Sequence, residues 1–149
     1  METHGTIGAI LKNKGTDLWS VPPESTVFEA IQMMSDKNVG ALLVMSGNKL
    51  HGIVSERDYT RKIALKGKSS KETAVGTIVS TPVISATPNH TIGECMRLMT
   101  NNRVRHLPVL DGEIVLGIVS IGDLVNWIIS AQTHTINQLE SYITGQYPG

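Results

Sequence analysis

Apolar residues recur along this chain at two spacings, one typical of amphipathic helices and the other of short strands. Thr26 precedes a helical pattern in which Val27, Ala30 and Met34 share one face. Two apolar runs follow, and the Ser-Gly-Asn-Lys segment between them predicts a hairpin. The first half therefore predicts helix, strand, helix, strand, strand, helix: 6–12, 19–21, from Thr26, 41–45, 50–54 and 55–65.

The second half predicts the same order of elements: 74–79, 83–86, 91–101, 106–110, 115–119 and a helix from Ser120 to about residue 144. Residues 66–73 are polar and read as the linker between the halves. We accordingly expect domains at 7–66 and 74–131, followed by a helical extension over 132–149.

The two halves are copies of one unit. Gly52-Ile-Val-Ser-Glu-Arg-Asp58 returns 65 residues later as Gly117-Ile-Val-Ser-Ile-Gly-Asp123, and the register also aligns Pro23 with Pro88 and Thr26 with Thr91. A unit of this length present twice favours two halves packed across a pseudo-two-fold axis, because an open solenoid needs more repeats.

Composition narrows the function classes. The 13 basic and 13 acidic residues balance, so no overall charge recruits nucleic acid or an anionic membrane. Cys95 is the one cysteine, which excludes an intramolecular disulfide and a cysteine-rich metal site. No apolar run approaches the length of a membrane helix, and no leader pattern opens the chain. We expect a cytoplasmic protein, or an organellar matrix protein if the source is eukaryotic.

Candidate chemistry lies where the second hairpin strand meets the next helix. Ser-x-x-Asp occurs there in both copies, at Ser55/Asp58 and at Ser120/Asp123. One interpretation is a helix cap, with Ser at the N-cap and an acid at the positive end of the helix. The other is a ligand site, in which the carboxylate accepts from a ribose diol beside the Ser hydroxyl. The presence of the Ser-x-x-Asp motif in both copies favours the second interpretation, a pair of ligand sites.

Basic residues are placed asymmetrically around these motifs. Arg57 and Arg61 accompany the first motif, whereas Arg105 leads into the second hairpin. We interpret these three arginines as phosphate contacts, because the guanidinium fork matches phosphate oxygens. The lysines over 66–71 are better read as a solvated face. The two sites are therefore expected to differ in affinity.

The order of motifs resembles the paired cystathionine-beta-synthase (CBS) domain, also called the Bateman module. The resemblance covers nearly the whole chain and rests on 74–79, on Ile84-Ser-Ala-Thr-Pro88, on Arg103-Val-Arg-His-Leu-Pro-Val109 and on the repeated Gly-Ile-Val-Ser-x-x-Asp. It looks most like the small stand-alone CBS pairs of bacteria and plant organelles. It implies an α/β fold, of the α+β type, with tandem repeats, two small sheets flanked by helices, and a long C-terminal helix.

The resemblance also implies that clefts between the repeats bind AMP, ADP, ATP or in some members NAD(H) or S-adenosylmethionine. Asp58 and Asp123 would then hold the ribose, with Ser55 and Ser120 beside them. The family pattern assigns the adenine edge to backbone at Val21, Ala41, Ala86 and Leu107, and the base wall to Pro108, which is matched by Leu43. With Arg57, Arg61, Arg105 and His106, these residues form the predicted nucleotide site.

Other chemistry is weakly supported. The histidines lack metal-ligand spacing, so no metal site is expected. No nucleophile elbow or phosphate-binding loop motif occurs, and only His106 is placed to serve as a base, so we expect no enzyme. A nucleic-acid binder would have to use the basic stretch 57–71. Cys95 aligns with Ala30 on the apolar face of its helix and is read as a core thiol.

The predicted last helix carries a heptad-like apolar stripe: Val125, Ile129, Gln132, Ile136, Leu139 and Ile143. The stripe could cover this chain's own core or pair two chains, and we predict a homodimer. Together, these features predict a regulatory protein that senses adenine nucleotides and relays their binding to a protein partner. The alternative is a dimeric interaction or scaffold protein that ignores nucleotides.

Overall fold

A computed structural model of the chain describes residues 5–15, 17–79 and 82–143. The elements in chain order are α1 (Ile7–Lys14), β1 (Ser20–Val21), α2 (Val27–Lys37), β2 (Ala41–Ser46), β3 (Lys49–Ser55), α3 (Glu56–Tyr59) with a π-helical turn (Thr60–Ala64), a 3-10 turn (Val75–Thr77), α4 (Ile92–Asn102), β4 (His106–Asp111), β5 (Ile114–Ser120) and α5 (Ile121–Ile143). Residues 144–149 of the expected extension lie outside the described ranges.

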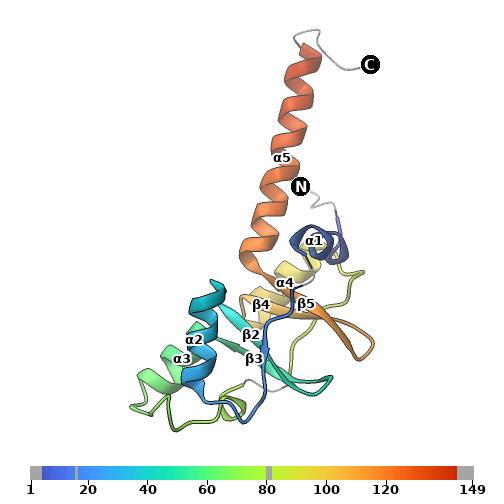
Figure 1. Cartoon of the computed structure of the whole chain (residues 1–149). Coiled ribbons are helices and arrows are strands. Elements are labelled where there is room, and N and C mark those ends of the chain that lie inside the picture. Colours follow the sequence, from blue (N-terminus) through green and yellow to red (C-terminus); the bar gives the residue numbers. More distant parts are fainter. Residues whose placement is uncertain (1–4, 16, 80–81, 144–149) are drawn as a thin grey trace.

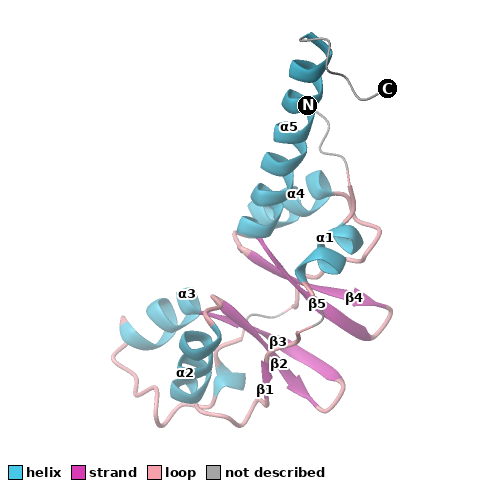
Figure 2. Cartoon of the chain, turned by 45° about the horizontal axis from the view of Figure 1, so that its top comes forward, coloured by secondary structure: helices cyan, strands magenta, loops and turns pink. Residues whose placement is uncertain are grey.

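The two repeats form two small sheets flanked by helices, as predicted. One sheet has the order β1-β2-β3, and the other is the hairpin β4-β5. Helices α2 and α3 lie beside the first sheet, whereas α1 and α4 lie beside the second (Figure 2). Helix α5 continues from β5 and projects away from the rest of the molecule (Figure 1).

Local sequence accounts for these helix starts. Thr26 accepts from the Glu29 backbone N–H while the Glu29 carboxylate accepts from the Thr26 N–H, and Thr91 with Glu94 repeats this capping box. The two hairpins share one irregularity, a register shift after Val44 in one and after Val109 in the other. The internal copies therefore agree in their hydrogen bonding as well as in their residues.

The expected strand at 83–86 does not form, because one donor is missing. In the first repeat the Leu43 N–H donates to the Trp19 carbonyl at 3.2 Å, which extends β1. The counterpart of Leu43 is Pro108, which has no amide hydrogen. Only an isolated parallel bridge between Ala86 and Val109 remains. The expected helix at 74–79 is likewise shorter, a single 3-10 turn at Val75–Thr77.

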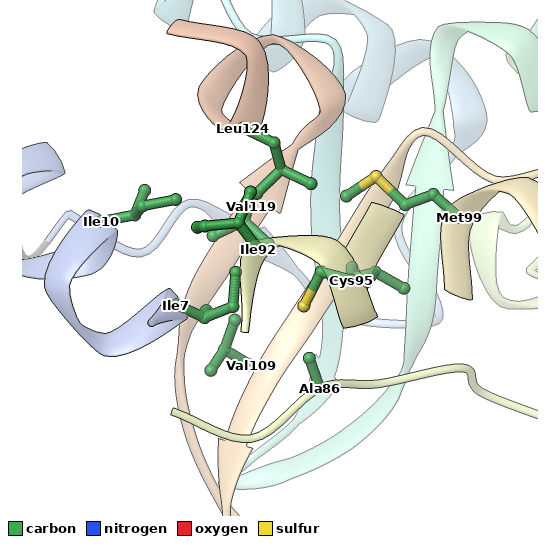
Figure 3. Close-up of a cluster of buried hydrophobic side chains, with 10 residues drawn as sticks. Ile7, Ile10, Ala86, Ile92, Cys95, Met99, Val109, Val119 and Leu124 are labelled. Carbon is green, nitrogen blue, oxygen red and sulfur yellow. The ribbon is translucent and has the colours of Figure 1, made fainter. Parts of the chain in front are cut away.

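The segment that leads into each repeat packs on the other repeat. Ile7 and Ile10 of α1 are buried in the core of the second repeat (Figure 3). Conversely, Val75 and Ile78 are buried in the core of the first repeat. The bridges Thr6–Thr91 and Thr26–Ala74 hold the two exchanged segments in place. Each core is therefore completed by residues from the opposite half of the chain.

Cys95 belongs to the second core. Its side chain is fully buried and lies among Ile7, Ile92 and Met99 (Figure 3). Ala30, its counterpart, is equally buried in the first core. The interpretation of Cys95 as a core thiol is confirmed. Burial raises the pKa of the Cys95 thiol to about 11.

Candidate ligand clefts between the repeats

Two of the clefts between the repeats each combine a Ser-x-x-Asp corner from one repeat with two segments of the other. The first, of about 480 Å³, contains Ser55 and Asp58 and is closed by 82–84 and 102–106; we call it the Asp58 cleft. The second, of about 370 Å³, contains Ser120 and Asp123 and is closed by 17–19 and 38–41; we call it the Asp123 cleft. Both volumes lie in the range of small-molecule sites, roughly 300–1,000 Å³.

Both Ser-x-x-Asp motifs have the geometry of a helix cap, which was the first of the two interpretations of their sequence. The Ser55 N–H donates to Asp58 Oδ2 at 2.9 Å, and the Asp58 N–H donates to Ser55 Oγ at 3.2 Å. In the second repeat the Ser120 N–H donates to Asp123 Oδ2 at 2.8 Å, and the Asp123 N–H donates back to Ser120 Oγ at 3.1 Å. These bonds fix both carboxylates at the edge of a cleft, so capping and ligand binding are compatible.

Each carboxylate also has a lysine partner, from a different source in each repeat. Lys62, one turn further along, places Nζ 3.2 Å from Asp58 Oδ1. Lys14, at the end of α1, places Nζ 2.7 Å from Asp123 Oδ2 and donates to the Ile118 carbonyl at 3.0 Å. The Asp123 pKa is lowered: burial would raise it, but the bonds from Lys14 and Ser120 outweigh that effect. No sequence signal connects Lys14 with Asp123.

His106 lies between the two clefts and lines both of them. A Cβ atom on Gly40 would be 3.5 Å from His106 Nε2, so the imidazole packs against the glycine backbone. Burial is the main cause of the lowered pKa of His106, and the positive charge of Lys14 adds to it. The lowered pKa favours the neutral form of the imidazole.

The structure brings together nine of the thirteen residues predicted for the nucleotide site. The Asp58 cleft is lined by Ser55, Arg57, Asp58, Arg61, Arg105 and His106, and the Asp123 cleft by Ala41, His106, Ser120 and Asp123. The other four, Val21, Ala86, Leu107 and Pro108, are buried and do not line either of these clefts. The Ala86 N–H and carbonyl already bond to β4, at Pro108 and Leu110.

Several residues that line the clefts are not among the thirteen predicted for the site. Asn38 and Arg103 occupy equivalent positions at the ends of α2 and α4, and both have φ of 54° in the left-handed region. Trp19 exposes part of its ring to the Asp123 cleft, and Lys37 Nζ lies 4.3 Å from the centroid of that ring. The αL position of Asn38 is readable from sequence, because Asn is favoured at helix ends. Arg103 gives no such signal.

The glycines of the repeated motif make room for side chains of this chain. A Cβ on Gly52 would lie 2.9 Å from Val79 Cβ, and one on Gly117 would lie 3.0 Å from Leu11 Cδ2. Leu11 and Gly117 also line the Asp123 cleft.

Within the described ranges, no group of three or more His, Cys, Asp or Glu side chains is arranged to hold a metal ion. No helix in those ranges has the length and hydrophobicity needed to cross a membrane.

Two internally related halves, each with its own small sheet and with clefts between them, define a tandem-repeat module. The CBS domain family matches this chain at residues 13–65 and again at 75–130, and the chain belongs to that family as a CBS pair. The CBS domain-containing protein CBSX3 of Arabidopsis thaliana, named as mitochondrial, is 40% identical over 95% of this chain and 73% of its own length.

Solved structures agree with this assignment. A CBS-domain protein from Burkholderia ambifaria is 45% identical and superposes with a TM-score of 0.82, covering 86% of this chain and 96% of its own. The CBS domain pair of protein MJ0100, solved in complex with 5'-methylthioadenosine and S-adenosyl-L-methionine, superposes with a TM-score of 0.74 over 85% of this chain and 98% of its own. It is 20% identical, so that likeness concerns the fold.

Proposed function

We propose that this chain is a non-catalytic sensor of adenosine-containing compounds, AMP, ADP, ATP or NAD(H), which bind in the clefts between its repeats. The observation that carries the proposal is the composition of each cleft. A carboxylate fixed by its own repeat faces segments of the other repeat, so a ligand in either cleft contacts both halves. The complex of the remote relative MJ0100 with two adenosine compounds supports this ligand class for the fold.

The ligand is held in the following way in this proposal. The carboxylates of Asp58 and Asp123 accept from the ribose hydroxyls, and the lysine on each carboxylate moves aside or bonds to the same ligand. Apolar walls meet the base, since Ile53 and Ile84 line the Asp58 cleft, and Leu18 and Leu43 line the Asp123 cleft. Buried bases are held well by such walls combined with a few fixed polar groups.

Occupancy is relayed as a population shift. A ligand that binds both repeats favours the relative arrangement in which it makes the most contacts, and it shifts the equilibrium only by its differential affinity for the two arrangements. Because each core contains a segment of the opposite repeat, a relative movement of the halves also moves α1 and the 75–78 segment. A protein partner that contacts those segments would detect the change.

We also propose that the chain forms a homodimer through α5. Four apolar side chains of the stripe are exposed: Val125 at 40%, Ile129 at 54%, Ile136 at 54% and Leu139 at 58%. At heptad spacing, isoleucine occupies one set of stripe positions, and Val125, Gln132 and Leu139 occupy the other. A β-branched residue at the first set with leucine at the second favours a two-stranded coiled coil. A dimer without ligand binding would be a scaffold, the second candidate function.

Thermal unfolding of the whole chain with AMP, ATP, NADH and S-adenosylmethionine tests the sensor. At a hundredfold excess over Kd a bound ligand adds about 2.7 kcal/mol to the free energy of unfolding, so the midpoint should rise by several degrees. Asp58→Ala or Asp123→Ala should weaken the affinity of its cleft by roughly 1.5–3 kcal/mol. Asp111→Ala, at an exposed position outside both clefts, is the matched control. No shift with any compound would leave the scaffold.

A further inference from the structure

The Asp58 and Asp123 clefts occupy corresponding places in the two repeats but carry opposite net charge. Five basic side chains line the Asp58 cleft, and each corresponds in the other copy to an uncharged residue: Arg57 to Gly122, Arg61 to Asn126, Lys62 to Trp127, Arg103 to Asn38 and Arg105 to Gly40. The acids of this cleft are Glu56 and Asp58, so three positive charges remain in excess. Clefts lined by charge of one sign concentrate ligands of the opposite sign.

The Asp123 cleft has the reverse balance. Among the described residues that line it, Lys14 is the one lysine or arginine, and Asp17 and Asp123 are the acids, so with His106 neutral one negative charge is in excess. Lys14 is also engaged, with its Nζ on Asp123 Oδ2 and on the Ile118 carbonyl. A phosphate in this cleft would meet two carboxylates and an ammonium that is already paired.

The backbone at Arg103 supports a role for its charge. Arg103 ends α4 with φ of 54°, a conformation that costs an ordinary residue free energy and that Gly or Asn adopts more easily. The counterpart in the first repeat is Asn38, one of the favoured residues. Arginine at the second position is therefore poor for the helix end but places a guanidinium at the Asp58 cleft.

Walls of the Asp123 cleft suit an uncharged or positively charged ligand. Trp19 stands where the other copy has Ile84, and its partly exposed ring offers a surface on which a base can stack. Lys37 covers that ring from outside the cleft lining, with its ammonium 4.3 Å from the ring centroid.

We propose, on the basis of the proposed function, that the clefts divide adenosine compounds by charge. The Asp58 cleft takes phosphorylated adenosine, with Arg57, Arg103 and Arg105 on the phosphates. The Asp123 cleft takes adenosine compounds without phosphate, neutral or cationic. The chain would then bind two kinds of adenosine compound at once, one in each of the two clefts that His106 lines.

Titration calorimetry on the whole chain with two probes, ATP and adenosine, tests this division. ATP should bind once per chain, with an affinity that falls steeply as salt rises, whereas adenosine affinity should change little with salt. Arg103→Asn and Arg105→Gln should each weaken ATP binding at least about tenfold and leave adenosine binding at the Asp123 cleft within about twofold. Lys68→Gln, which removes an exposed charge outside both clefts, is the matched control.

Carboxylate variants identify the clefts. Asp58→Asn should weaken ATP binding roughly ten- to hundredfold and leave adenosine binding within about twofold. Asp123→Asn should weaken adenosine binding by the same factor and leave ATP bound at one site per chain. Because Arg103→Asn relieves the helix end, loss of ATP binding in that variant cannot be ascribed to poor folding, and circular dichroism checks this. Two equal ATP sites per chain, or unchanged ATP affinity in both arginine variants, would overturn the division alone. Absence of heat with both probes would overturn the sensor as well.

Discussion

Lys14 Nζ lies 2.7 Å from Asp123 Oδ2, which ties the end of the first helix to the carboxylate corner of the second repeat. The two residues are 109 positions apart. The same ammonium bonds to the Ile118 carbonyl at 3.0 Å, so it crosses from α1 to the end of β5. The position of α1 and the state of the Asp123 cleft are therefore linked.

Acid should remove the stabilisation that Asp123 provides. Its pKa in the folded chain is lowered, because the bonds from Lys14 and Ser120 to the carboxylate outweigh burial. A lowered folded pKa means that the stabilisation is present above the unfolded pKa, near 3.9, and is lost as pH falls through the folded value. Urea unfolding at pH 6 should show Asp123→Asn less stable than wild type, and the gap should narrow at pH 3. An equal gap at both pH values would contradict this.

Removing Lys14 should raise the pKa of His106. Burial lowers that pKa most, and the charge of Lys14 is the next cause. In Lys14→Met the imidazole should titrate at a higher pH than in wild type, which NMR of the His106 ring protons measures directly. Lys68→Met removes a lysine outside both clefts and should leave the pKa of His106 unchanged. An unchanged curve in Lys14→Met would show that Lys14 does not act on His106.

The two motif glycines should tolerate alanine unequally. In Gly52→Ala the new methyl would lie 2.9 Å from Val79 Cβ, which is fixed to the backbone, and overpacking of this kind costs roughly 1–3 kcal/mol. In Gly117→Ala the nearest atom is Leu11 Cδ2 at 3.0 Å, the end of a side chain that can rotate away. Denaturant unfolding should therefore rank Gly52→Ala as the less stable variant. The reverse order would show that α1 is held more rigidly than Val79.

Cys95 should be inert in the folded protein. With a pKa of about 11 only about one thiol in a thousand is ionised at pH 8, and the side chain is fully buried. A disulfide reagent at pH 8 should label native protein slowly and guanidinium-unfolded protein at once. Thr100→Cys places a second thiol on the exposed side of the same helix and should give one rapid equivalent. Rapid labelling of the native wild type would contradict the buried position.

Charge on the α5 stripe should separate the proposed dimer. Ile129→Glu with Ile136→Glu puts two carboxylates on the exposed seam and should halve the mass measured by light scattering at micromolar concentration. Ser130→Glu with Asn137→Glu adds the same charge at exposed positions beside the seam and should retain the dimer. A wild-type mass equal to one chain would refute the dimer.

Much of this architecture could be predicted because the same sequence pattern occurs in both halves of the chain. Thr26 and Thr91 mark helix starts with the same partner residue three positions later, and the hairpins repeat their apolar runs. The prediction of a strand at 83–86 was wrong. The apolar pattern of that segment does not reveal that Pro108, in the neighbouring strand, has no N–H to donate to it. The hydrophobic pattern of a segment indicates its own preferred secondary structure, whereas the hydrogen bonds of a β-ladder depend on both strands.

The clefts were only partly predictable. Ser55, Asp58 and their copies are marked by a local motif, so their place at a cleft followed from sequence. Lys14 could not be found in this way, because it reaches Asp123 through the packing of α1 on the opposite repeat. Arg103 was visible as a basic residue, but its left-handed backbone was not.

The exchanged segments make the two halves inseparable. If the linker over 66–73 were cut, the first fragment would carry α1 without the core that Ile7 and Ile10 fill, and the second would carry Val75 and Ile78 without theirs. Neither fragment could complete itself, but each holds what the other lacks. Mixed in solution, the fragments should reassemble into one particle, in which each supplies the core residues that the other lacks.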